Sequence, residues 1–185
     1  MSLSANSPSK EYIYAGGKVV ATEESANPST VILPRNLGVF FSGDTWRLDY
    51  DGDNEWSEAP PDKLYQPYGI SGDIGVAGDW NGSGTSKIGV FRIEGGVGKW
   101  YLDINGNGIW NGDGVDKIVF AFGQPDDKPV VGDWNGSGSS KIGVFRITGG
   151  LGSWLVDYDG NALWEGTDHI YSFGQSGDQP VVGKW

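Results

Sequence analysis

Short apolar segments separated by glycine-containing turns run through most of the chain, and they recur at a fixed interval. Residues 131–175 repeat the pattern of residues 77–124, and tryptophans mark the interval, with 54 residues between successive copies at Trp46, Trp100 and Trp154. Self-similarity at a period of about 50 residues is typical of a repeat architecture. We therefore expect one structural unit to be built several times along this chain.

Each copy contains four apolar segments, and none shows the periodicity of an amphipathic helix. The predicted strands cover residues 31–33, 37–41, 46–50 and 63–68, then 75–80, 87–93, 99–104 and 117–122, then 129–134, 141–147, 153–158 and 169–173. Four antiparallel strands per repeat are typical of a β-propeller blade. The pattern predicts an all-β fold, a small β-propeller of about four blades.

The organisation along the chain follows from the same pattern. We expect a poorly ordered leader at residues 1–10, a hairpin and link at 11–29, and propeller repeats at 30–74, 75–128 and 129–178. Residues 179–185 match only the first strand of a further copy. That strand and the N-terminal hairpin can together form a fourth blade, which joins the hairpin and the repeats into one domain and hides unpaired strand edges. The alternative is a fragment whose ring closes with further sequence or by oligomerisation.

Composition narrows the class of protein. The 32 glycines lie at matching places in the repeats, and nine tryptophans argue against disorder. A net charge of −11 without a basic cluster excludes nucleic acid as a partner. The absence of cysteine removes disulfides and thiolate sites, and no apolar segment is long enough to insert into a membrane.

A first type of loop joins the first two strands of a copy. The motif GDWNGSG at residues 78–84 precedes IGVFR at 88–92, and both recur at 132–138 and 142–146. The repeat resembles the FG-GAP/VCBS family of β-propeller repeats. That resemblance implies calcium bound by oxygens at the first, third, fifth and ninth loop positions and by a backbone carbonyl at the seventh. In this chain serine stands at the fifth position and lysine, Lys87 or Lys141, at the ninth. We expect the lysine ammonium to take the place of the cation in these loops.

The resemblance also implies an extracellular or bacterial cell-surface protein that acts in adhesion or recognition. The segment EYIYAGGKVVATEE at residues 11–24 is similar to the closing piece of bacterial Rhs/YD-repeat proteins. We therefore expect the chain to be part of a larger polypeptide.

A second type of loop follows the third strand of each copy. Its carboxylate and amide oxygens occupy positions one, three and five, as at the start of an EF-hand loop. These candidate calcium ligands are Asp49, Asp51 and Asp53, then Asp103, Asn105 and Asn107, then Asp157, Asp159 and Asn161. The alternative is a hairpin turn stabilised by Asp and Asn side chains without metal, because such turns favour the same residues.

Three tryptophans at equivalent positions, Trp80, Trp134 and Trp185, are candidate ligand-binding residues at the mouth of the propeller. Stacked aromatics bind sugars or peptides, but residues that keep step with a repeat more often pack between its units. His169, the only histidine, lies beside Asp168 without a nucleophile or second ligand. No catalytic constellation is recognisable, so we expect no enzyme.

Two functions remain open. The first is a non-enzymatic binding module that recognises protein or carbohydrate, with calcium stabilising its loops. The second is a structural spacer or cap of a larger Rhs-like surface protein, with no ligand of its own.

Overall fold

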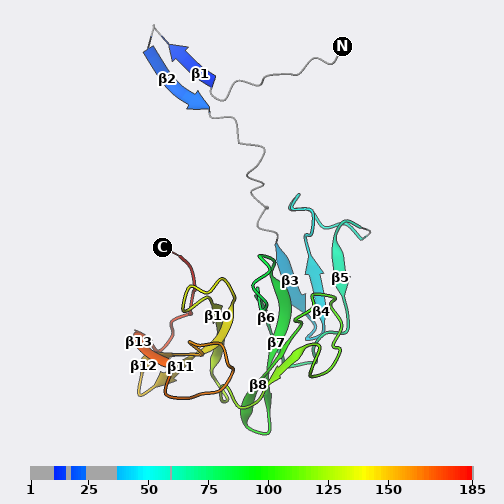
Figure 1. Ribbon diagram of the computed structural model, residues 1–185, viewed down its shortest axis with the longest axis vertical. Helices are drawn as coiled ribbons and strands as arrows, with labels where there is room; N and C mark the ends of the chain where they lie inside the picture. The colour runs from blue at the N-terminus through cyan, green and yellow to red at the C-terminus, as the bar shows by residue number, and fades with distance from the viewer. Residues whose placement is uncertain (1–10, 16–17, 24–36, 59, 185) are drawn as a thin grey trace. The chain divides into compact units, whose positions relative to one another are not determined.

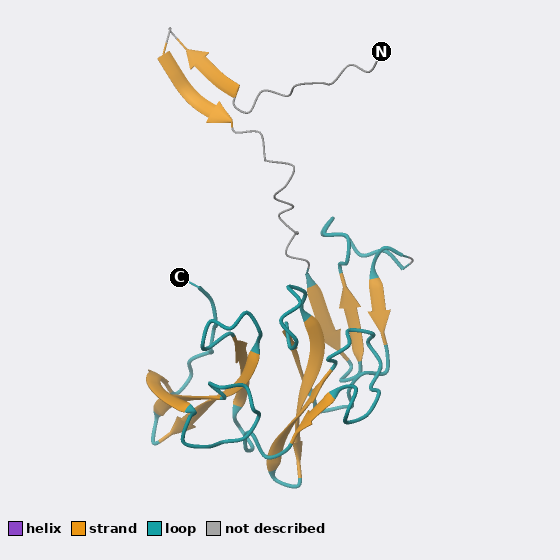
Figure 2. Cartoon of the chain, in the orientation of Figure 1, coloured by secondary structure: helices purple, strands orange, loops and turns teal. Residues whose placement is uncertain are grey.

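The computed structural model describes residues 11–15, 18–23, 37–58 and 60–184, and these residues contain strands and loops but no helix (Figure 2). The chain divides into two compact units, Met1–Arg35 and Asn36–Trp185. In the first unit β1 (Glu11–Ala15) pairs antiparallel with β2 (Lys18–Glu23), as the hairpin pattern predicts. The described residues contain no helix that is long and apolar enough to cross a membrane.

The second unit contains three antiparallel sheets in chain order (Figure 1). Sheet 1 consists of β3 (Gly38–Phe41), β4 (Thr45–Leu48) and β5 (Lys63–Tyr65). Sheet 2 consists of β6 (Ile74–Gly78), β7 (Lys87–Glu94), β8 (Val97–Leu102) and β9 (Lys117–Val119). Sheet 3 consists of β10 (Lys128–Gly132), β11 (Lys141–Thr148), β12 (Leu151–Val156) and β13 (His169–Gln175).

The all-β prediction is confirmed, and the strands of sheets 2 and 3 lie within a few residues of their predicted bounds. The predicted strand at residues 31–33 lies outside the described residues, so the described part of sheet 1 has three strands. Residues 181–184 form no strand, although the sequence predicts one there. Without a neighbouring strand to accept and donate backbone hydrogen bonds, an isolated extended segment is not a ladder.

One aromatic pair recurs at the centre of every sheet. Trp46, Trp100 and Trp154 on the third strand lie opposite Phe40, Phe91 and Phe145 on the second, with ring centroids 4.6, 5.0 and 5.3 Å apart. Each indole N–H donates to the backbone carbonyl of an aromatic residue near the end of the fourth strand, at 3.1 Å to Tyr68, 2.8 Å to Phe122 and 3.0 Å to Phe173. The repeated tryptophan therefore connects three strands: it lies on the third, packs against the second and donates a hydrogen bond near the end of the fourth.

Neighbouring sheets pack face to face through the same positions. Ile88 and Val90 of β7 form a buried cluster with Trp46 and Tyr68 of sheet 1. The equivalent Ile142 and Val144 of β11 join the cluster that contains Trp100 and Phe122 of sheet 2. The first strands of the two complete sheets, β6 and β10, lie side by side. Each junction thus buries two aliphatic side chains of one sheet against the aromatic residues of the sheet before it.

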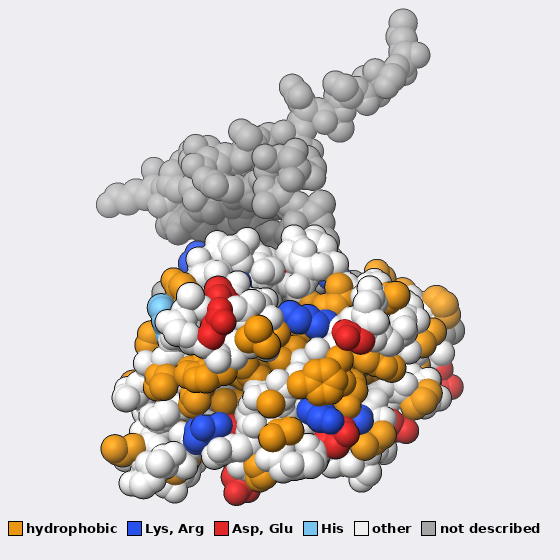
Figure 3. Space-filling model, turned by 60° about the horizontal axis from the view of Figure 1, so that its bottom comes forward, with side chains coloured by type: hydrophobic (Ala, Val, Ile, Leu, Met, Phe, Trp, Pro, Cys, Tyr) orange, Lys and Arg blue, Asp and Glu red, His pale blue; other side chains and the backbone are white. Residues whose placement is uncertain are grey.

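Ion pairs fix the turns that lead into each complete sheet. Arg92 donates two hydrogen bonds of 2.8 Å to Asp73, and Arg146 donates bonds of 2.8 and 2.7 Å to Asp127. Both aspartates are almost fully buried, with 1% of their side chains exposed. Lys and Arg beside Asp and Glu also flank a band of hydrophobic side chains in the view of Figure 3.

Candidate cation sites and a cleft between sheets

The two types of loop lie at the same end of the sheets, because they follow strands that run in the same direction in each antiparallel sheet. A first-type loop joins β6 to β7 and another joins β10 to β11; second-type loops follow β4, β8 and β12. The amide of Asn81 in a first-type loop donates to the carbonyl of Ile104 in a second-type loop at 3.1 Å. Loop residues from distant parts of each repeat therefore meet at one surface.

In the β6–β7 loop the ammonium of Lys87 occupies the centre of the turn. It donates to the side-chain oxygens of Asn81 and Ser83, both at 2.7 Å, and to the Thr85 carbonyl at 2.9 Å. Its distance to a carboxylate oxygen of Asp79 is 3.4 Å. These are the first, third, fifth and seventh positions of the loop, whose oxygens the resemblance assigns to calcium.

The β10–β11 loop repeats the arrangement. The ammonium of Lys141 donates to Ser137 at 2.6 Å, to the Ser139 carbonyl at 3.0 Å and to Asp133 at 3.1 Å. The Lys141 side chain is 5% exposed. A buried ammonium needs several acceptors, and this loop supplies three. The ammonium in each first-type loop thus lies among the oxygens that the resemblance assigns to a cation, at the position where the sequence predicts it.

Electrostatics agree with this geometry. Partial burial alone raises the pKa of Asp79, but hydrogen bonds from the Gly84 and Ser83 amides and the neighbouring Lys87 together lower it below the ordinary value. The pKa of Asp133 is lowered in the same way, against burial, by Gly138, Lys141 and Ser137. A folded-state pKa below the unfolded value contributes stability above the unfolded pKa and loses it as pH falls through the folded pKa. Both loops are therefore stabilised at neutral pH.

The second-type loops share an Asp-centred backbone turn. The first aspartate accepts from amides three and five residues ahead: Asp49 from Gly52 at 2.7 Å and Asn54 at 3.1 Å. Asp103 accepts from Gly106, Asn107 and Gly108, and Asp157 accepts from Gly160 and Ala162. The sixth position has positive φ in all three loops, at Asn54, Gly108 and Ala162. These are the bonds that the turn interpretation predicts, in which Asp side chains stabilise the backbone of their own loop.

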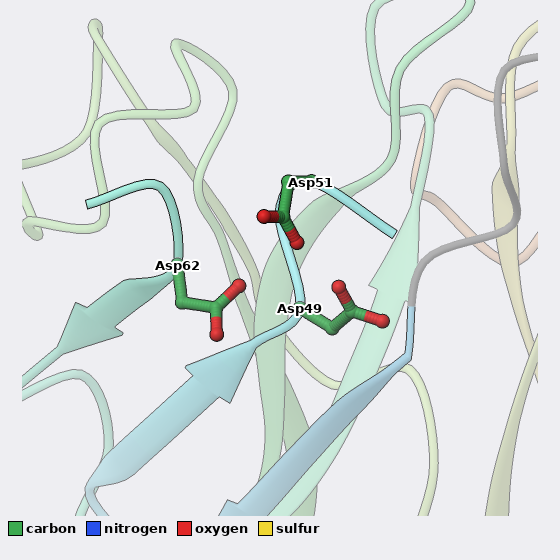
Figure 4. A group of neighbouring side chains, drawn as sticks. All are labelled: Asp49, Asp51 and Asp62. Carbon is green, nitrogen blue, oxygen red and sulfur yellow. The ribbon is translucent and has the colours of Figure 1, made fainter. Parts of the chain in front are cut away.

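Two of these three loops also gather carboxylates. Asp49, Asp51 and Asp62 have oxygens within 4.8 Å of one another, with Asp62 just before β5 (Figure 4). Asp157, Asp159 and Asp168 form the equivalent group in sheet 3. Carboxylate oxygens at such spacing are the ligands that calcium prefers. Both clusters can hold a cation.

The sheet 3 cluster carries additional oxygen-bearing side chains. The amide of Asn161 donates to Asp159 at 3.1 Å and to Glu165 at 2.8 Å, and the Thr167 hydroxyl donates to Asp159 at 2.7 Å. The described part of sheet 2 forms no such acidic group. There the amides of Asn105 and Asn107 both donate to Asn111 at 2.8 Å. Of the candidate ligands in the sequence, those around β8–β9 are instead engaged in an amide network.

Sequence reasoning missed the aspartate that closes each second-type loop. Asp62, Asp116 and Asp168 each accept two backbone N–H bonds, for example Asp116 from Ile104 at 3.0 Å and Asn111 at 2.6 Å. An aspartate just before every fourth strand was the available signal. Its distance from the first aspartate is 13 residues in two loops and 11 in the third, so no fixed-spacing motif reveals it.

Burial disfavours the charged form of the first aspartate in two of the second-type loops, Asp103 and Asp157. It raises the pKa of Asp103 and Asp157 above the usual value, although backbone amides oppose the change, and the nearby Asp116 or Asp168 raises it further. A carboxyl with a raised folded-state pKa gains a proton more readily when folded, so its charge reduces stability at neutral pH. A bound cation relieves this cost.

The candidate ligand-binding tryptophans are engaged in packing. The indole N–H of Trp80 donates to the Ile88 carbonyl and that of Trp134 to the Ile142 carbonyl, each at 3.0 Å. Each ring lies so close to its own strand that a side chain at Gly78 or Gly132 would clash with it. Trp185 lies outside the described residues. The packing interpretation therefore accounts for Trp80 and Trp134.

Trp80 is nevertheless only partly buried, and it lines a cleft of about 330 Å³ between sheets 2 and 3. The lining of the cleft includes the polar residues Lys117, Asn135 and Asp159 and the apolar residues Ile104 and Val119. Loops of both types border it. A partly apolar cleft with several convergent polar groups is the usual form of a small-ligand site.

His169 packs against two tyrosines. Its ring stacks on Tyr158 at 3.9 Å between centroids, and Nδ1 lies 2.8 Å from the Tyr171 hydroxyl. This is the packing role that a lone histidine indicates.

The chain matches no protein-family model, no curated protein and no solved structure at a significant level.

Proposed function

We propose that the three sheets are consecutive blades of a small β-propeller and that the protein is a non-enzymatic binding module. Two observations support the architecture: the complete sheets approach each other through their first strands, and every junction repeats the same aliphatic-on-aromatic contact. Radial repetition of four-stranded sheets about their first strands is the arrangement of a propeller.

Carbohydrate is the ligand class that the cleft between sheets 2 and 3 favours. A sugar ring offers hydroxyl groups for Asn135, Lys117 and Asp159, and C–H groups for the edge of Trp80. The cleft is the single observation that carries this assignment. Protein recognition by the same loop surface is the second candidate, since the loops present several exposed apolar side chains, Ile109, Trp110 and Leu163.

Calcium stabilises the loops in this proposal. The acidic clusters of sheets 1 and 3 are the sites, and the lysine-filled loops are not. Calcium at millimolar concentration outside the cell fits weak extracellular sites of this kind. We accordingly place the protein outside the cell or on a bacterial cell surface.

The test is a screen of the intact chain against immobilised glycans in calcium. Asn135→Ala and Asp159→Ala remove polar groups from the cleft and are expected to weaken binding several-fold. Ser83→Ala, in the other first-type loop, is the matched control and keeps wild-type binding. Retained binding by both cleft variants would contradict this site. Failure to bind any glycan or surface protein would leave a spacer or cap domain.

A further inference from the structure

Sheet 1 is the first of the three sheets in residues 37–184, and one of its faces is covered by no other sheet of these residues. Leu37 and Val39 occupy the positions that Ile88 and Val90 have in sheet 2, because Asp49 N–H donates to the Leu37 carbonyl as Asp103 N–H donates to that of Ile88. Ile88 and Val90 are 2% and 1% exposed, whereas Leu37 and Val39 are 59% and 56% exposed. Within residues 37–184, no other sheet covers these two side chains.

The third sheet has the opposite face uncovered. Phe173 receives the tryptophan hydrogen bond of sheet 3, so it is equivalent to Tyr68 and Phe122. Those two residues are 2% and 3% exposed, but Phe173 is 77% exposed. Within residues 37–184, no sheet follows sheet 3 to cover this face.

These two faces are the complementary halves of a junction that the chain already makes twice. In both junctions the aliphatic pair of one sheet covers the aromatic residues of the sheet before it. We infer that two copies of this chain associate end to end, with sheet 3 of each copy packed against sheet 1 of the other. The inference rests on the proposed propeller architecture.

The number of copies follows from closure. Propellers generally have four to eight blades. Residues 37–184 supply three sheets, one fewer than the smallest propeller needs, whereas two chains supply six. Both ends of each chain are then covered, and no open face remains to recruit a third copy.

The C-terminal segment supports this arrangement. The Gln175 amide donates to Asp178 at 2.9 Å, as the Gln124 amide donates to Asp127 before β10. The following residues, 179–183, thus begin as a first strand does, but Val181 is 66% exposed where the equivalent Val130 is 5% exposed. The described part of sheet 1 lacks a first strand. In the pair of chains, residues 179–183 of one copy join β3 of the other.

Charge is consistent with this pairing. Asp73 and Asp127 are each held by an arginine, but no cation pairs with the Asp178 carboxylate in the described part of the chain. In sheet 2 Arg92 stacks on Tyr101, with 4.5 Å to the ring centroid. In sheet 1, Phe41 stands at the position of Arg92, and Arg47 stands at the position of Tyr101. The Arg47 guanidinium stacks on Phe41, with 4.9 Å to the ring centroid. Arg47 therefore brings a guanidinium to the region that an incoming Asp178 would enter.

Disulfide trapping tests the arrangement, since the chain has no cysteine of its own. Ala77 lies opposite Ile88 and Val131 opposite Ile142, so Val182 is expected opposite Leu37 of the other copy. Both side chains are exposed, so Leu37→Cys/Val182→Cys should fold. We expect a disulfide-linked species of twice the 19.8 kDa chain mass on non-reducing gels. Leu37→Cys/Val181→Cys, one residue out of register, is the control and should not form this species, because neighbouring strand residues face opposite sides.

Light scattering on the wild-type chain should give the two-copy mass, and Phe173→Asp should halve it while the circular dichroism spectrum stays that of a β protein. A folded wild-type monomer at every concentration, or an intramolecular disulfide, would overturn the inference in favour of closure within one chain. A monomer that still bound glycans would refute the pairing and leave the proposed function intact.

Discussion

At the scale of single residues, the residues at two positions decide what a first-type loop contains. Serine at the fifth position and lysine at the ninth, read from the sequence, predict an ammonium in place of calcium, and Lys87 and Lys141 lie there. This was predictable because the chemistry is local: a cation of either kind needs the same converging oxygens. For the tryptophan at position two of each first-type loop, the sequence predicts packing between repeats. Trp80 packs against the core cluster that sheets 2 and 3 share, and its indole also donates to a carbonyl of its own sheet.

Removing the ammonium tests its role. Lys141→Met should destabilise the fold by about 1–3 kcal/mol, because it removes the charged donor that Asp133 and Ser137 share. Chemical denaturation of wild type and variant measures the difference. The control is Lys99→Met, whose lysine pairs with the exposed Glu94 and should matter little. Equal losses in both variants would show that the loop position is not special.

Restoring the oxygens should restore the metal. Ser83→Asp/Lys87→Asp places carboxylates at the fifth and ninth positions in place of the serine and the ammonium, and we expect this variant to gain a calcium-dependent rise in Tm beyond that of the wild type. Ser137→Asp alone keeps Lys141 in the second loop and should gain no such rise. A double variant that is as insensitive to added calcium as the single one would contradict the account of this loop.

At the scale of elements, sequence periodicity predicts the strands well and the loop ligands only in part. The tryptophan spacing places β4, β8 and β12 because each indole is fixed by the same carbonyl bond. The closing aspartates Asp62 and Asp168 escaped prediction because loops of unequal length separate them from Asp49 and Asp157. Which carboxylates meet is a property of the fold, since it depends on how strand four returns beside strand three.

Two ion pairs, Arg92–Asp73 and Arg146–Asp127, connect the second strand of each complete sheet to the turn before its first strand. Arg146→Met should cost about 2–4 kcal/mol, because it leaves the Asp127 carboxylate buried without its charged partner. Arg146→Lys keeps the positive charge but not the bidentate hydrogen bond to Asp127, so we expect a smaller loss of unfolding free energy. Urea unfolding of the three proteins gives the order. A methionine variant as stable as the lysine variant would mean that the buried charge is satisfied in another way.

At the scale of the whole molecule, the repeat predicts how the sheets follow one another but not what covers the outer faces of sheets 1 and 3. A pattern that recurs in each sheet indicates the junctions and cannot say which face lacks a neighbour. Two comparisons of exposure locate the open faces. Phe173 is exposed where Tyr68 and Phe122 are buried, and Val39 is exposed where Val90 is buried. A net charge of −11 on each copy also opposes association, so pairing should strengthen as salt concentration rises.

The most direct measurement of the loops' function is thermal unfolding of the intact chain in calcium and in chelator. A ligand that binds only the native state raises Tm by mass action, so calcium at saturation should raise the midpoint by several degrees. The double variant Asp51→Ala/Asp159→Ala removes one carboxylate from each cluster and should lose most of that rise. Equal midpoints of the wild-type chain in calcium and in chelator would contradict the account and leave the second-type loops as turns held only by their own backbone.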